Sequence, residues 1–260
     1  MSHLKVNLAV YRLHEFSKLG NTVHGFSTRQ FYPLTVRDLW QRTPVALQFA
    51  SQVGFDLEKV VAMDQVHGDR IAMVDSKDTG KLIGKTDGLV TREKGVYLAI
   101  KTADCAPLLF YEIQKQIIAV AHAGWKGVLK KIAGKVVHKM KDEFGADTSQ
   151  ILVGIGPTIG ACCYHITRER LDLFKTELGA DLTVYSLRKK QIFLDLPLMI
   201  IKQLVKAGIK ESNIENGAIC TVCFSQKFYS RRADMARYGK LQGEIIGILG
   251  MRRQINDSFQ

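Results

Sequence analysis

The spacing of apolar residues changes once in the middle of the chain, and this change predicts where strands give way to a helix. Three short runs rich in apolar and β-branched residues, at 97–100, 107–111 and 117–121, predict strands of a largely buried sheet. From Val128 the apolar positions follow a spacing of 3.6 residues instead. This predicts an amphipathic helix that ends near Gly145.

Later segments predict a further mixture of strands and helices. Residues 151–155 predict a strand that enters the glycine-rich segment 154–160, which we interpret as a structural turn because its spacing does not match a dinucleotide-binding loop. Residues 168–178 predict a helix, and Asp195 is a suitable N-cap for another. Residues 245–249 predict a late strand.

Because these strands and helices do not alternate strictly, the fold class that we expect is α+β, or mixed α/β. No linker, internal repeat or low-complexity tract divides the chain. We therefore expect one domain that spans residues 1–260.

Composition is that of an average globular protein, with 46% hydrophobic residues, and only the charge is unusual. A total of 37 Lys and Arg against 25 Asp and Glu leaves a formal net charge of +12, which would suit nucleic acid, anionic lipid or a phosphate-bearing substrate. The predicted helix carries five of these charges on its polar side, namely Lys130, Lys131, Lys135, Lys139 and Lys141. No basic cluster is interleaved with aromatic residues, so we expect no nucleic-acid partner.

The cysteines and the N-terminal segment bear on the compartment. Five cysteines, an odd number at low density, argue against a disulfide framework and favour a reducing compartment. Residues 1–16 lack the continuous apolar stretch of a secretory signal. The longest uncharged stretch, 148–164, is too short and too rich in glycine to span a membrane. We expect a cytoplasmic protein with no membrane partner, and predict no particular oligomeric state.

Cys220 and Cys223 form a C-x-x-C pair, which is half of a structural zinc site. The remaining half would have to come from Cys162 and Cys163, whose adjacency is the wrong spacing for a second pair. We therefore expect a buried apolar role for Cys220 and Cys223, with redox and metal-binding roles as alternatives.

Three local sequences each present one metal-binding side chain at a turn: QVHG with His67, TADCAP with Cys105, and AHAGWKG with His122. Reversal of the chain between consecutive strands would place Cys105 and His122 at one edge of the sheet, whereas His67 has to arrive from elsewhere. Two imidazoles and a thiolate suit Zn²⁺, and three protein ligands leave a fourth position open, as in catalytic zinc sites. Asp104 is a candidate hydrogen-bond acceptor for a ligand, or a base. Spacing alone also permits purely structural roles for these residues.

The motifs QVHG, TADCAP, AHAGWKG, GIGPTIG, CT and FYSRRAD, in this order, resemble the multicopper polyphenol oxidase or laccase-domain family, whose members act as purine nucleoside phosphorylases. The resemblance extends from GFSTR at residues 25–29 to the C-terminal strand. It implies a single α+β domain with mixed sheets sandwiched between helices in a layered α/β/β/α arrangement, and a zinc ion held by His67, Cys105 and His122. The implied reaction is phosphorolysis of adenosine, inosine, guanosine or methylthioadenosine to the base and a ribose 1-phosphate, with adenosine deamination in some members.

Three alternatives stay open beside this reading. A copper-dependent polyphenol oxidase is one, although multicopper oxidases use paired H-x-H segments that none of the seven histidines forms; a single His, Cys, His site can still bind Cu²⁺. A hydrolase that edits peptidoglycan precursors is another, with Cys105 as nucleophile and His122 as base. The last is a binding module in which the metal is structural.

Substrate contacts are assigned on residue type and motif. Thr28, Arg29, Lys126 and Arg231 are the candidates for binding phosphate or ribose. Three aromatic residues are candidates for stacking on a purine, namely Trp125, Phe228 and Tyr229. The partners that we expect are therefore a purine nucleoside and phosphate.

The chain departs from the family pattern at three positions. His165 stands where the family has a glutamate, and Lys126 and Lys240 stand where it has arginines. Lysine keeps the charge but loses the planar fork of arginine, so we expect it to bind phosphate as a point charge.

Overall fold

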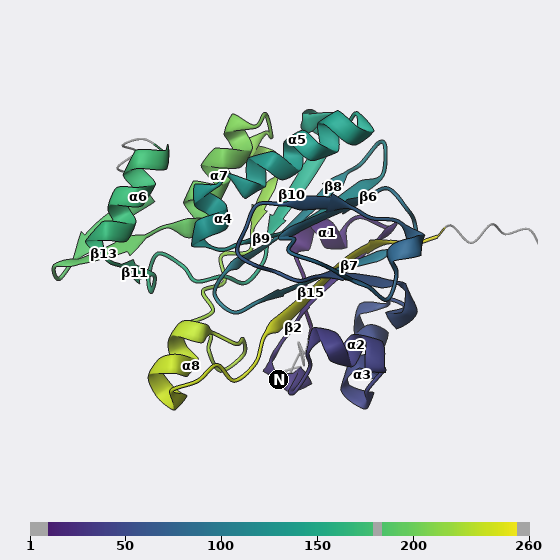
Figure 1. Cartoon of the computed structure of the whole chain (residues 1–260), viewed down its shortest axis with the longest axis horizontal. Coiled ribbons are helices and arrows are strands. Elements are labelled where there is room, and N and C mark those ends of the chain that lie inside the picture. The colour runs from purple at the N-terminus through teal and green to yellow at the C-terminus, as the bar shows by residue number, and fades with distance from the viewer. Residues whose placement is uncertain (1–9, 179–183, 254–260) are drawn as a thin grey trace, which may run out of the picture.

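Two six-stranded sheets form the centre of the computed structural model, which describes residues 10–178 and 184–253 (Figure 1). The strands of the first sheet are, in spatial order, β1 (Val10–Tyr11), β2 (Thr22–Ser27), β15 (Ile245–Met251), β7 (Tyr97–Thr102), β3 (Val60–Met63) and β5 (Leu82–Ile83). Those of the second are β14 (Ile214–Asn216), β10 (Ile151–Ile155), β8 (Ala106–Glu112), β9 (Ile117–Ala123), β6 (Gly88–Thr91) and β4 (Ile71–Met73). Both sheets contain parallel and antiparallel pairs.

Helices cover the outer face of each sheet. The helices of the described residues are α1 (His14–Ser17), α2 (Val36–Gln41), α3 (Pro44–Val53), α4 (Trp125–Leu129), α5 (Ile132–Phe144), α6 (Arg168–Leu178), α7 (Leu196–Lys206) and α8 (Arg231–Tyr238). Figure 1 shows α2 and α3 on one side of the paired sheets, and α5 and α7 on the other. A small third sheet beside α6 has the order β11 (His165–Ile166), β13 (Gln191–Leu194) and β12 (Tyr185–Arg188).

Alternation of side chains along the central strands divides the apolar core into layers. In β9, Ile118 and Val120 lie in the core between the two sheets, whereas Ala119 and Ala121 lie in the core shared with α5 and α7. Successive side chains of a strand point to opposite faces, so a strand buried on both faces is apolar throughout. The result is the mixed α/β single domain with layered α/β/β/α order that the sequence predicted.

The predicted strands and helices are confirmed with one correction. The amphipathic helix expected from Val128 to Gly145 is two helices, because α4 ends at Leu129 and α5 begins at Ile132. Between them Lys131 has a φ of 61°, and a residue in this left-handed conformation cannot continue a right-handed helix. The spacing of apolar residues does not reveal this break, because both helices bury their apolar side and the spacing continues across it.

Asp195 caps α7 as predicted, since its Oδ1 accepts a hydrogen bond from the backbone N–H of Leu198 at 2.9 Å. Within the described residues no helix combines the length and the apolar character needed to cross a membrane. Residues 1–9, which make up much of the segment analysed for a secretory signal, lie outside the described residues.

Candidate active site

The pairing of β8 with β9 places Cys105 and His122 side by side. Pro107 lies opposite His122 in this antiparallel pair, and Cys105 directly precedes β8. His67 comes from the loop between β3 and β4. One ligand atom from each of His67, Cys105 and His122 lies within 4.8 Å of the others. The structure therefore brings together the three residues that the sequence singled out.

Gln65 ties the loop that carries His67 to the first sheet. Its Nε2 donates to the carbonyl oxygen of Lys101 at 2.8 Å, and its Oε1 accepts from the backbone N–H of Lys101 at 2.9 Å. Lys101 belongs to β7, so the side chain of Gln65 pairs with that strand as a neighbouring backbone would. His67 has a φ of 58°, an uncommon conformation for a residue other than glycine.

A buried carboxylate that sequence reasoning missed, Asp87, holds the backbone at His67 and the ring of His122. It accepts hydrogen bonds from the backbone N–H groups of Val66 at 3.2 Å, His67 at 3.0 Å and Gly68 at 2.7 Å. Its Oδ1 also lies 2.8 Å from Nδ1 of His122. This contact fixes the His122 ring and leaves Nε2 as the nitrogen available to a metal.

These contacts set the charges of the site. Burial raises the pKa of the Asp87 carboxyl, but the hydrogen bonds from His122 and Gly68 outweigh it and leave the pKa below its usual value. Burial raises the pKa of the Cys105 thiol, and hydrogen bonds from His122 and His67 reverse this effect and bring the pKa to about 7. Burial lowers the pKa of His122, while Asp87 and Cys105 raise it to about 9. These contacts thus favour a thiolate at Cys105 paired with a protonated His122.

The space around the three ligands is kept free by Gly124. A Cβ atom at this position would lie 2.9 Å from Sγ of Cys105 and 3.1 Å from Cδ2 of His67, so a larger residue would displace both. Two imidazole nitrogens and one thiolate form a donor set that suits Zn²⁺ and also accepts Cu²⁺. The residues present therefore fit the metal that the sequence predicted.

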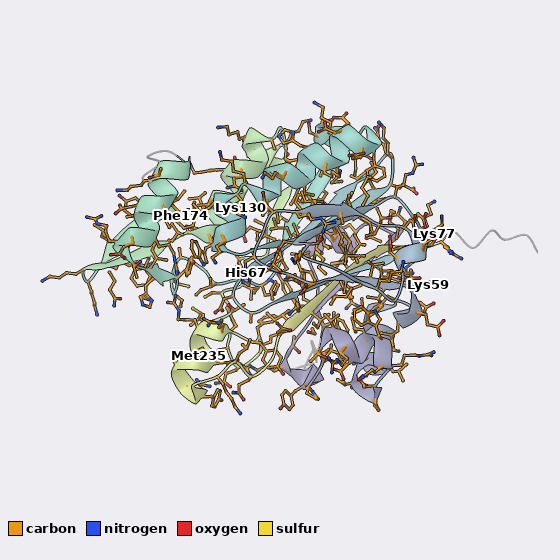
Figure 2. All side chains as sticks on the ribbon, viewed as in Figure 1. Lys59, His67, Lys77, Lys130, Phe174 and Met235 are labelled. Carbon is orange, nitrogen blue, oxygen red and sulfur yellow. The ribbon has the colours of Figure 1, made fainter. Side chains whose placement is uncertain are left out.

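A pocket of about 480 Å³ opens beside the three ligands. Figure 2 labels two of the residues that line it, His67 near the middle of the molecule and Met235 on α8. Asp104 and Cys105 also line it. The remaining polar and aromatic lining comes from α4, the segment before β11, α6 and α8, namely Trp125, Lys126, Tyr164, Arg170, Arg231 and Arg232.

The cations of the pocket have no carboxylate partner. Among the described residues, no ion pair involves Lys126, Arg170, Arg231 or Arg232. The Arg170 guanidinium instead lies over the ring of Trp125, 4.5 Å from its centroid. Positive charge gathered without a counter-ion next to a metal-type ligand set is suited to an anionic ligand.

Asp104 holds the floor of the pocket together. Its Oδ1 accepts from Oγ1 of Thr221 at 2.6 Å, and its Oδ2 accepts from the backbone N–H of Arg232 at 2.6 Å. Its carboxylate therefore binds the first turn of α8, whereas the hydrogen-bond acceptor of His122 is Asp87.

Two of the sequence candidates for phosphate binding lie away from the pocket lining. Arg29 forms an ion pair with the buried Asp234 and donates from Nε to the carbonyl oxygen of Ser225 at 2.8 Å. Thr28 is buried and caps the short helical turn that carries Arg29. Arg29 thus supports α8 through Asp234, while the other two candidates, Lys126 and Arg231, line the pocket.

Some of the aromatic candidates and of the residues that depart from the family pattern line the pocket, and others lie away from it. Trp125 lines the pocket, whereas Phe228 and Tyr229 are buried in the core between the sheets. His165 receives hydrogen bonds from Arg232 at its ring and, at 3.1 Å, at its carbonyl oxygen. Lys240 is exposed and does not line the pocket.

Sequence reasoning missed Arg170 and Tyr164 as well as Asp87. Arg170 is on a helix that was predicted, but nothing in the local sequence distinguishes it from the other charged residues of that helix. Tyr164 follows two cysteines in a turn, and only the fold places it at the pocket.

Comparison with known proteins agrees with the motifs. Residues 44–248 match the model of the family described as multi-copper polyphenol oxidoreductase laccase. Purine nucleoside phosphorylase YlmD of Bacillus subtilis is 34% identical over 204 residues, which cover 75% of this chain and 73% of the relative. A protein named adenosine deaminase RL5, from an unknown prokaryotic organism, is 32% identical over 196 residues, which cover 72% of this chain and 74% of the relative.

Solved structures with the same fold include a hypothetical protein YfiH of Bacillus licheniformis, with a TM-score of 0.83, 27% identity, and coverage of 94% of this chain and 97% of that one. YlmD of Geobacillus stearothermophilus gives a TM-score of 0.78 at 29% identity, over 90% of this chain and 93% of that one. The order of the motifs, the extent of the match and the shared fold agree, and the chain belongs to the multi-copper polyphenol oxidoreductase laccase family.

Proposed function

We propose that the protein is a purine nucleoside phosphorylase that acts in the cytoplasm on a free nucleoside and phosphate. The observation that carries this proposal is the pocket of about 480 Å³, in which cations without a carboxylate partner and aromatic rings lie beside the cluster of His67, Cys105 and His122. A volume of this size lies within the range of about 300 to 1,000 Å³ typical of small-molecule sites. The relatives named as purine nucleoside phosphorylases support the same reaction.

His67, Cys105 and His122 are the residues that would hold the metal, with Zn²⁺ favoured by the donor set. Bound there, the ion would supply a Lewis acid for an oxygen of phosphate or nucleoside. Asp87 acts through His122, because it holds the imidazole in the orientation that leaves Nε2 free.

The chain's own residues bind and orient the two substrates. Lys126, Arg170 and Arg231 attract phosphate, and the rings of Trp125 and Tyr164 offer apolar surface to a purine. In the reaction a bond forms between a phosphate oxygen and the anomeric carbon while the glycosidic C–N bond breaks. The bonding pair leaves with the base, which takes up a proton.

The test is incubation of the zinc-loaded protein with phosphate and adenosine, inosine, guanosine or methylthioadenosine in turn. We expect release of the free base and ribose 1-phosphate in amounts that match. Release of base from none of the four would contradict the proposal.

A pair of variants locates the reaction. Lys126→Gln should raise the KM for phosphate about tenfold, the effect of one lost charge-assisted contact, and leave the KM for nucleoside nearly unchanged. Lys77→Gln is the matched control, because Lys77 is an exposed lysine that Figure 2 shows far from His67. Equal effects of the two substitutions would argue against a phosphate site at Lys126.

Adenosine deamination is a second candidate reaction at the same site, supported by the relative named adenosine deaminase RL5. It predicts formation of inosine from adenosine without phosphate. The hydrolase alternative, with Cys105 as nucleophile, predicts that a thiol reagent labels Cys105 equally well with and without zinc. Protection of Cys105 by zinc would instead support its role as a metal ligand.

A further inference from the structure

Four of the five cysteines gather at a second place, outside the lining of the pocket. We call Cys162, Cys163, Cys220 and Cys223 the four-cysteine cluster, since their Sγ atoms all lie within 4.8 Å of one another. Sγ of Cys223 is 3.5 Å from those of both Cys162 and Cys163. Their spacing along the chain argued against such a group, and the buried apolar role expected of the C-x-x-C pair is wrong for Cys223, which is exposed.

Backbone pairing between two loops brings the cysteines together. Thr158 and Cys220 form a parallel β-bridge, in which the N–H of Thr158 donates to Ile219 at 3.1 Å and the N–H of Thr221 donates to Thr158 at 3.0 Å. Cys162 and Cys163 follow a few residues later in a turn. Cys162 and Cys163 are adjacent, and both can still contribute to the cluster because the other two cysteines come from a different loop.

One sulfur atom of the cluster has a backbone donor of the kind that metal-bound thiolates have. The backbone N–H of Gly160 donates to Sγ of Cys220 at 3.3 Å, and such contacts orient and stabilise ligating groups. All five cysteines are free, and separations of 3.5 Å are well beyond the roughly 2.05 Å of a disulfide bond. In a tetrahedral zinc site with Zn–S bonds of about 2.3 Å, neighbouring sulfur atoms lie about 3.8 Å apart.

Packing does not explain the cluster, because Cys162 and Cys223 are exposed and only Cys220 is buried. We propose that the four-cysteine cluster is a second metal site, a structural one, in which four thiolates bind one Zn²⁺ ion. Binding releases the thiol protons to solvent and closes all four coordination positions with protein ligands.

A metal ion bound at this site would stabilise the loops that form one wall of the pocket. The loop of Cys162 and Cys163 supplies Ile159 and Tyr164 to the pocket lining, and Thr221 of the other loop donates to Asp104 at 2.6 Å. The carbonyl oxygen of Cys163 also accepts a hydrogen bond from Arg232 at 3.3 Å. The proposal concerns metal content and does not depend on the reaction catalysed.

Zinc content of the full chain, measured after loading with Zn²⁺ and removal of free metal, is the first test. We expect about two equivalents in the wild type and about one in C162S/C223S, whose substituted side chains are exposed and leave the core intact. The matched control, A161S/S225A, changes residues of the same loops that offer no sulfur and should keep two equivalents. An unchanged zinc content in C162S/C223S would overturn the proposal.

Cobalt loading of Cys105→Ala protein is the second test, because it leaves the four-cysteine cluster as the only sulfur-rich site. Co²⁺ should then give intense sulfur-to-metal charge-transfer absorption and the visible bands of a tetrahedral site, and both should vanish when C162S/C223S is added. Intact mass under mild oxidation distinguishes the remaining explanation. A loss of two mass units in zinc-treated protein would show a disulfide and contradict metal binding.

Discussion

Two buried histidines, His122 on β9 and His24 on β2, differ in what surrounds them. Both are almost fully buried, 3% and 4% exposed respectively. Burial lowers the pKa of both, but Asp87 and Cys105 raise that of His122 to about 9, whereas that of His24 falls to about 4. Nε2 of His24 accepts a hydrogen bond from the backbone N–H of Leu13 at 3.0 Å.

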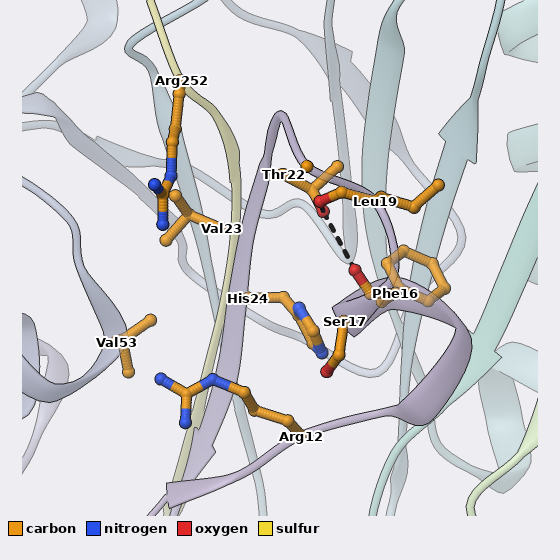
Figure 3. Close-up of a pocket in the computed structure, with 10 residues that line it drawn as sticks. Arg12, Phe16, Ser17, Leu19, Thr22, Val23, His24, Val53 and Arg252 are labelled. Carbon is orange, nitrogen blue, oxygen red and sulfur yellow. Dashed lines mark hydrogen bonds between the residues drawn. The ribbon is translucent and has the colours of Figure 1, made fainter.

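Among the described residues that line the pocket around His24, none has an acidic side chain. Figure 3 shows His24 in a pocket of about 220 Å³ whose charged lining residues are Arg12 and Arg252, and the hydroxyl of Thr22 nearby donates to the carbonyl oxygen of Phe16 at 3.2 Å. Burial with only backbone partners keeps a histidine neutral and structural. Burial beside a carboxylate and a thiol instead prepares a group for chemistry, so the partners of a buried histidine are more informative than its burial.

Removal of Cys105 should have the largest effect on this contrast. Cys105→Ala takes away one of three metal ligands, and loss of a Lewis acid worth several kcal/mol should lower base release by about 10³-fold or more. Steady-state rates with adenosine and phosphate measure this. The far-ultraviolet circular dichroism should not change, and a variant that retains wild-type rates would show that the reaction does not need this ligand.

The carboxylate that distinguishes His122 from His24 can be tested next. Asp87→Asn should lower zinc affinity by about 10- to 100-fold, because the amide supports the His122 ring less well and offers one acceptor oxygen where the carboxylate offers two. Competition with a chromogenic chelator measures the affinity. Asp69→Asn, at a partly exposed carboxylate paired with Lys130 and Lys135, is the control and should leave zinc affinity unchanged.

A stability measurement against pH tests the other histidine. Since the pKa of His24 is about 4 in the folded protein and about 6.5 when unfolded, the unfolded chain binds its proton more readily. Its contribution to stability is complete above pH 6.5 and is lost as the pH falls towards 4, by up to about 3 kcal/mol. Urea unfolding from pH 7 to pH 4 measures this loss.

His24→Gln isolates that contribution. Glutamine offers an acceptor to the N–H of Leu13 but does not titrate, so the variant should be less dependent on pH in this interval than the wild type. If the free energy of unfolding depends on pH in the same way in the variant and the wild type, other groups cause the acid sensitivity.

The smallest effect is expected at the surface. Asp69→Asn removes ion pairs with two lysines that are each about half exposed, so the free energy of unfolding should fall by less than about 1 kcal/mol. Urea unfolding at low salt measures this change. A larger loss of unfolding free energy would show that surface ion pairs contribute as much to stability as the buried histidines do.

The fold was predictable where one local property determined the structure. Short runs of apolar and β-branched residues predicted β7, β8 and β9, and Asp195 predicted the start of α7, because burial and capping act over a few residues. The break at Lys131 was not predictable, because lysine has no intrinsic preference for a left-handed conformation. Tertiary packing of α4 and α5 decides it.

The residues of the site were also predictable only where a local feature of the sequence marked them. Its three metal ligands stood out because each lies in a distinctive motif, and the resemblance to a family joined them. Asp87 lies 20 residues from His67 and 35 from His122, and only the fold brings its carboxylate to both. The four-cysteine cluster could not be predicted from the spacing of cysteines along the chain, because a β-bridge between two loops brings its members together.

The break between α4 and α5 has a consequence for engineering the pocket. α4 presents Trp125 and Lys126 to the pocket, whereas α5 packs its apolar side against the second sheet. Lys131 separates the two helices, so Lys126 belongs to a short helix whose axis is distinct from that of α5. Directed evolution of the pocket can therefore begin at Lys126, whereas Trp125 also packs against the core that α5 shares with the second sheet and has less freedom to vary.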